Sequence, residues 1–87
     1  MADFVPLCAP IQSFAQDMQR KLDANHIKSG WDESALLWLL RRLRQETNEL
    51  EKALRDPDAL PIDLIDEAAD VGNFAMMIAD QVKRGRK

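Results

Sequence analysis

Residues 66–80 read DEAADVGNFAMMIAD, and this stretch decides the fold. Its spacing predicts an α-helix, and at about 100° per residue its apolar side chains occupy roughly 240° of the circumference. A helix that covers a core from one side needs only about 100°. We therefore expect this helix to be covered on at least two sides, partly by a second copy of the chain. Glu67 lies within the apolar arc between Phe74 and Ile78, and Asp70 is one turn away.

The composition indicates one small folded domain over residues 1–87. The hydrophobic fraction of 46 % is that of a globular protein. A chain of this length buries only about 60–65 % of its unfolded surface, so homo-oligomerisation is expected. The 12 basic and 15 acidic residues, net −3, argue against a general nucleic-acid binder. Cys8 is the only cysteine, which excludes an internal disulfide and a thiolate zinc site.

Three helices are predicted, over residues 10–25, 33–55 and 61–83, between a tail at 1–9 and a basic tail at 84–87. Pro10 and Pro61 suit the first turn of a helix, and the DPDALP segment separates the second helix from the third. Asp32 or Ser34 can cap the second helix. The predicted class is all-α: a three-helix protomer that completes a bundle of four or more helices by homo-oligomerisation.

Four carboxylates occupy unusual positions on the second and third helices. Glu46 falls where another leucine would continue the leucine stripe of residues 33–55, and Glu49 lies about 60° away at its edge. Glu67 and Asp70 repeat this arrangement on the third helix. The ordinary alternative is a solvated helix surface, or pairing with nearby arginines such as Arg42.

If the two helices pack through these faces, the four carboxylates converge. Removing even one unpaired carboxylate from water costs on the order of several kcal/mol, and placing carboxylates close together adds repulsion between their charges. Protonation relieves part of this cost, and bound divalent cations relieve it better. Because a site of oxygen ligands selects hard ions, we expect Mg²⁺ or Mn²⁺.

The segments SALLWLLRRLRQETNELEKAL and DEAADVGNFAMMIAD resemble the MazG-like nucleoside triphosphate pyrophosphohydrolases of the all-α NTP pyrophosphatase group. The mark of that group, ExxE followed by ExxD, is met by the four acids named above, with Asn73 in the DxxN extension. The KSGW segment, residues 28–31, is also similar. The resemblance covers about residues 26–82.

The resemblance implies a Mg²⁺-dependent enzyme that hydrolyses an NTP or dNTP to a nucleoside monophosphate and pyrophosphate. Its role would be removing non-standard nucleotides or trimming nucleotide pools. By carry-over, Glu46, Glu49, Glu67 and Asp70 hold the metal, and Glu46 or Glu49 orients the attacking water or takes its proton. Family members form dimers or tetramers.

The substrate contacts are less closely specified. Asn73 is expected to hydrogen-bond the sugar, the base or a metal-bound water. Trp31 can stack on a base, or it can cover a helix junction. Family members continue past the ExxD helix with further basic residues, whereas this sequence ends at Lys87. The phosphate contacts are therefore expected from Lys28, from Lys83 and the basic tail, or from a partner chain.

The chain is expected in the cytoplasm, because MADFVPLCAP lacks the basic start and long apolar run of a signal peptide, and no apolar run approaches the length of a membrane span. Two other functions remain open. One is a non-catalytic helical dimerisation module in which arginines pair with the acids. The other is a nucleic-acid-associated protein, which only the KRGRK end favours.

Overall fold

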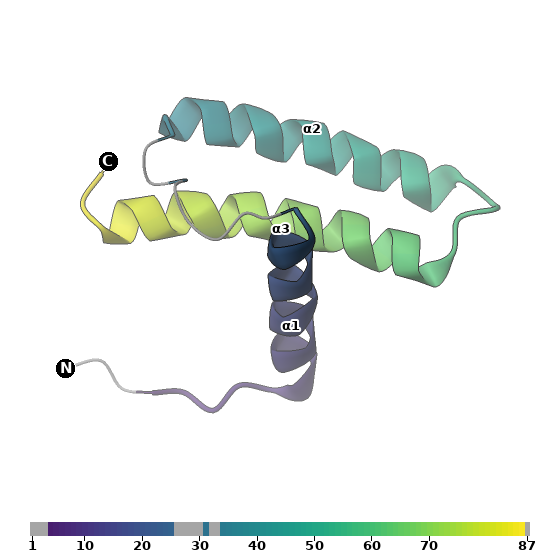
Figure 1. Ribbon diagram of the computed structural model, residues 1–87, viewed down its shortest axis with the longest axis horizontal. Helices are drawn as coiled ribbons and strands as arrows, with labels where there is room; N and C mark the ends of the chain where they lie inside the picture. Colours follow the sequence, from purple (N-terminus) through teal and green to yellow (C-terminus); the bar gives the residue numbers. More distant parts are fainter. Residues whose placement is uncertain (1–3, 26–30, 32–33, 87) are drawn as a thin grey trace.

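The computed structural model describes residues 4–25, 31 and 34–86, and within these residues all regular structure is helical. Helix α1 spans Ala9–Ala24, α2 spans Leu36–Arg55 and α3 spans Pro61–Lys83. Figure 1 shows α2 and α3 lying side by side and running in opposite directions, with α1 crossing α3 steeply. The all-α prediction is confirmed.

The starts of α1 and α3 follow from their prolines, which stand in the first turn of each helix. At α3 the backbone N–H of Leu60 also donates to Asp63 Oδ2 (3.1 Å). These interactions satisfy or remove backbone N–H groups that have no partner inside the helix. The helix α3 has the same bounds as the predicted 61–83, and α1 begins and ends one residue before the predicted 10–25.

The predicted start of α2 at residue 33 is wrong, because the helix begins at Leu36 and Ser34 does not cap it. Ala35 is the N-cap and makes no side-chain cap. Ser34 is held outside the helix: its N–H donates to the carbonyl of Trp31 (3.0 Å), and its own carbonyl accepts a hydrogen bond from Gln81 Nε2 (2.7 Å). The other predicted cap, Asp32, lies outside the described residues.

The core is small and centres on α3. Leu22 of α1, Leu39 of α2 and Met77 of α3 are buried together, with Phe74 and other apolar side chains packed around them. Helix α3 packs closely against α2 and against α1, while the backbones of α1 and α2 do not approach each other closely within the described residues. The two other helices of the same chain thus cover two sides of the wide apolar arc of α3.

Gly72 permits the close approach of α1 to α3. A Cβ atom at this position would lie 2.8 Å from the ring of Phe14 and 3.3 Å from the sulfur of Met18. The amide of Asn73 fixes the same contact, because its Nδ2 donates to the carbonyl of Met18 (3.0 Å). This docking brings the C-terminal half of α1 to the part of α3 that carries the acidic residues.

Candidate metal centre

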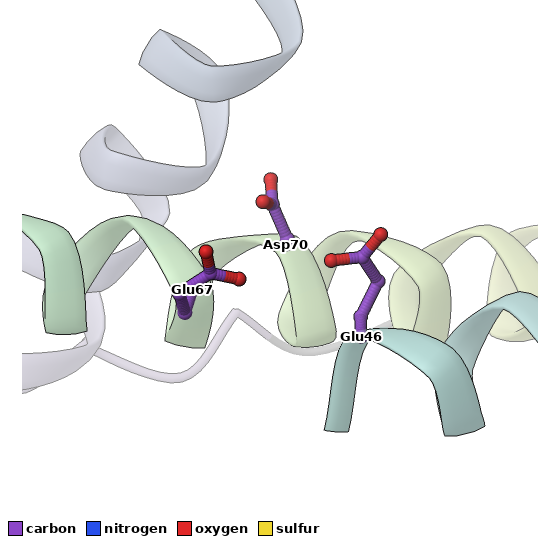
Figure 2. A group of neighbouring side chains, drawn as sticks. All are labelled: Glu46, Glu67 and Asp70. Atoms are coloured by element: carbon purple, nitrogen blue, oxygen red, sulfur yellow. The ribbon is translucent and has the colours of Figure 1, made fainter. Parts of the chain in front are cut away.

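Three of the four predicted carboxylates meet between α2 and α3. Glu46, Glu67 and Asp70 each offer one oxygen, and these oxygens lie within 4.8 Å of one another. Figure 2 shows Glu67 and Asp70 projecting from α3 and Glu46 from α2, with the carboxylates around a common space. Two oxygens on opposite sides of a bound Mg²⁺ lie about 4.2 Å apart, since Mg–O distances are about 2.1 Å. Small side-chain rotations would therefore close the group on an ion.

The fourth predicted ligand, Glu49, is not part of this three-carboxylate cluster. It is exposed on α2, one turn beyond Glu46. Its charge still acts on the cluster, because repulsion from Glu49 contributes to the raised pKa of Glu67. The sequence placed Glu49 at the edge of the leucine stripe, and an edge position on a helix leaves open whether the side chain turns inward or to solvent.

The electrostatics of the cluster disfavour its fully charged form. Burial raises the pKa of Glu67 above its ordinary value of 4.5, and repulsion from Asp70, Glu46 and Glu49 raises it further, partly offset by Lys21. Burial also raises the pKa of Asp70 above 3.8, against the lowering effect of Lys21. A divalent cation would reverse the sign of the local potential and relieve both groups.

Two basic side chains contact the cluster, one from α1 and one from α2. Arg42 Nη2 lies 2.9 Å from Glu46 Oε1, and Lys21 Nζ lies 3.7 Å from Asp70 Oδ2. The guanidinium of Arg42 also stands over the ring of Phe74, 5.0 Å from its centroid. Pairing of an arginine with the acids was one of the alternatives open from the sequence. The sequence analysis missed Lys21, because helical periodicity does not tell against which helix α1 packs.

A pocket of about 320 Å³ adjoins the cluster. Its lining combines side chains of all three helices: Leu22, Asn25, Arg42, Glu46, Asp70, Asn73, Phe74 and Met77. Asn73 is only 4 % exposed, and its Oδ1 is buried with no hydrogen-bond partner among the described residues. Leaving a buried acceptor unpaired costs about 1–3 kcal/mol, so this oxygen suits a donor brought by a ligand.

The other predicted substrate residues lie away from the cluster or outside the described residues. Trp31 packs against the core, and its Nε1 donates to Asp80 Oδ2 (3.0 Å). Lys83 is exposed in the last turn of α3. It follows Asp70 by 13 positions, which corresponds to about 20 Å along the helix axis. Lys28 lies outside the described residues. A substrate role for these three side chains stays a prediction.

The three carboxylates form a group that could hold a divalent cation. Oxygen ligands suit Mg²⁺ or Mn²⁺, and the partly exposed position leaves coordination sites for water or phosphate. Comparison of the chain with protein-family models, with curated proteins and with solved structures finds no match.

Proposed function

We propose that this chain is a Mg²⁺-dependent nucleoside triphosphate pyrophosphohydrolase, with Mn²⁺ as a possible substitute. The observation that carries the proposal is the meeting of Glu46, Glu67 and Asp70, from two helices, within 4.8 Å beside a pocket. These are three of the four acids of the ExxE and ExxD pattern. The raised pKa values of Glu67 and Asp70 support a site built for added positive charge.

The unpartnered Oδ1 of Asn73 is a second, independent reason to place a ligand here. The residue Asn73 lines the same pocket as Glu46 and Asp70, and its Oδ1 is buried without a partner among the described residues. An acceptor in this position suits a metal-bound water, a sugar hydroxyl or an N–H group of a base. The carboxylate cluster and this oxygen are therefore expected to serve one ligand, a metal–nucleotide complex.

The proposed reaction is attack of a water oxygen on the α-phosphorus. The bond from this phosphorus to the bridging oxygen of the β-phosphate breaks, and pyrophosphate leaves with the electron pair. The bound metal would neutralise charge on the phosphates and acidify the water. A carboxylate of the chain accepts the proton, and Glu46 and Glu49 remain the two candidates. Glu49 lies outside the cluster and is exposed, which would leave its carboxylate free of metal.

Assembly into a homodimer or homotetramer is part of the proposal. Exposed apolar side chains on α2 support this, since Leu37 is 71 % exposed and Trp38 is 47 % exposed. Burying such side chains against a second copy is favourable.

The cytoplasm is the proposed location. Among the described residues, none of the helices has both the length and the apolar character needed to cross a lipid bilayer.

A non-catalytic helical module is the second candidate, and the ion pairs favour it. Arg42 and Lys21 already neutralise part of the cluster through Glu46 and Asp70. In such a module the acids would orient the helices, and no cation would be needed. The two candidates differ in whether added Mg²⁺ changes the protein.

Pyrophosphate release across a panel of standard and damaged nucleotides, with and without Mg²⁺, tests the proposal. We expect release only with the divalent cation, and its loss in the Glu67→Gln variant. Glu51→Gln is the matched control, because Glu51 is exposed on α2 and pairs with Arg55. Absence of release from every nucleotide, together with no response to Mg²⁺, would favour the non-catalytic module.

A further inference from the structure

We propose that Lys21 and Arg42 form the phosphate-binding half of this site, and that a divalent cation releases them from Asp70 and Glu46 to contact the polyphosphate. This inference rests on the proposed function and names residues that neither the sequence pattern nor the resemblance assigned. It adds two residues that already lie at the carboxylates to the phosphate contacts expected from Lys28 or Lys83.

Their positions suit this role. Lys21 reaches Asp70 of the cluster from α1, and Arg42 reaches Glu46 of the cluster from α2. Arg42 lines the pocket itself. Both ion pairs are partly open to water: the side chain of Lys21 is 19 % exposed and that of Arg42 is 33 % exposed. A phosphate oxygen can therefore approach either cation without opening the core.

The two contacts differ in how firmly they hold the carboxylates. The separation of 3.7 Å between Lys21 Nζ and Asp70 Oδ2 exceeds a hydrogen-bond distance, so a metal ion can take Asp70 with little competition. Arg42 donates hydrogen bonds to Glu46 Oε1 (2.9 Å) and to Gln45 Oε1, and it is also braced on the ring of Phe74. The aromatic contact would keep the guanidinium at the pocket wall after Glu46 turns to the metal. Its planar group can then donate two hydrogen bonds to one phosphate.

The net charge of the cluster makes phosphate binding by Lys21 and Arg42 depend on the bound metal. Three ionised carboxylates and two basic groups give −3 + 2 = −1 for the metal-free cluster. One divalent cation changes this to +1 and a second changes it to +3. The metal-free cluster repels a polyphosphate, whereas the loaded cluster attracts it. Lys21 and Arg42 supply the two units that make the loaded site positive after the acids have been neutralised.

The acidic cluster does not carry this inference alone. Asn73 lines the pocket together with Arg42 and Asp70, and its Oδ1 is buried without a partner among the described residues. A ligand that combines a metal, phosphates and a donor group would satisfy all of these side chains together.

The test separates binding of the metal alone from binding of the triphosphate. Lys21→Gln and Arg42→Gln are compared with wild type and with Arg41→Gln, a control on the exposed side of α2. Mg²⁺ alone is measured by thermal shift, and a non-hydrolysable nucleoside triphosphate analogue is titrated with Mg²⁺ present. We expect both variants to bind Mg²⁺ at least as tightly as wild type but the analogue about tenfold or more weakly. The control should change neither affinity.

The inference is overturned if Lys21→Gln and Arg42→Gln weaken the analogue no more than Arg41→Gln, while wild type binds Mg²⁺ and releases pyrophosphate. That result would leave the proposed function standing. If wild type neither responds to Mg²⁺ nor releases pyrophosphate, the proposed function fails first, and this inference fails with it.

A measurement on the unmodified chain keeps the inference testable if a variant does not fold. The reactivity of the Lys21 amine toward an acylating reagent can be read by peptide mass spectrometry. Reactivity should rise with Mg²⁺ alone, because the contact with Asp70 is lost, and fall when the analogue is added. A reactivity that does not change with either addition would overturn the assignment of Lys21.

Discussion

Replacing Glu67 by Gln tests the cluster most sharply, because it should change stability in opposite directions with and without metal. Two unit charges 4.8 Å apart repel by about 1–3.5 kcal/mol at effective dielectric constants between 80 and 20. Lys21 and Arg42 offset part of this for the wild type. We therefore expect the metal-free variant to be more stable by about 1 kcal/mol, or roughly 4–8 °C in Tm for a domain of this size.

With Mg²⁺ the order should reverse. A ligand at 100 times its Kd stabilises the folded state by about 2.7 kcal/mol, and the variant loses one of three cluster ligands. The assay is thermal unfolding at one protein concentration, with and without Mg²⁺, for wild type, Glu67→Gln and Glu51→Gln. The Glu51→Gln variant loses only its exposed ion pair with Arg55, so its Tm should respond to Mg²⁺ as that of wild type does. A wild-type Tm that Mg²⁺ leaves unchanged, or a metal-free Glu67→Gln that is less stable than wild type, would refute the reasoning.

Three further predictions address pH and packing. The pKa of Glu67 is raised on folding, so the metal-free folded chain binds more protons than the unfolded chain. The contribution of Glu67 to stability therefore grows as the pH falls toward 4.5 and is lost as the pH rises. The stability advantage of Glu67→Gln should accordingly be largest at neutral pH and vanish as the pH falls below 4.5, and a pH-independent difference between the two melting curves contradicts this. Gly72→Val should lower the free energy of unfolding by about 1–3 kcal/mol through overpacking between α1 and α3. The control Ala75→Val, at an exposed position of the same helix, should have little effect. Urea titrations measure both variants. Gln81→Ala should lower the free energy of unfolding by about 1–3 kcal/mol, because Gln81 is 2 % exposed and donates to the carbonyls of two residues before α2. Chemical denaturation compares this variant with Gln16→Ala, a control at an exposed position. Equal midpoints would show that these hydrogen bonds do not stabilise the contact between α3 and the segment before α2.

The sequence predicts the helices well because helical periodicity and proline are local signals. The bounds of α3 follow from Pro61 and from the long apolar arc. The position of Glu46 inside the leucine stripe and of Glu67 inside the arc of α3 likewise depends only on the geometry of single helices. Three members of the cluster could therefore be predicted before their spatial arrangement was known.

The remaining features depend on contacts between segments far apart in the chain. The start of α2 moves to Leu36 because Gln81, almost fifty residues away, binds the backbone around Ser34. Lys21 joins the cluster because α1 packs against α3 at Gly72. Both effects are set by tertiary packing, and no local propensity encodes them.

The packing of α3 shows the same distinction between what helical periodicity predicts and what tertiary packing decides. Its wide apolar arc correctly indicates cover on more than one side, but α1 and α2 of the same chain supply two of those sides. Periodicity measures how much of a helix must be covered and is silent on which segment covers it. Assembly with a second copy therefore stays a prediction, supported by the exposed apolar side chains of α2.

Titration with Mn²⁺, followed by electron paramagnetic resonance, tests directly whether the three carboxylates bind a divalent cation. The signal of free Mn²⁺ should decrease in proportion to added wild-type protein, recover when Mg²⁺ competes, and stay unchanged with Glu67→Gln. A free-ion signal that wild-type protein does not reduce would show that the three carboxylates, paired with Lys21 and Arg42, do not bind the cation and that the proposed metal centre is absent.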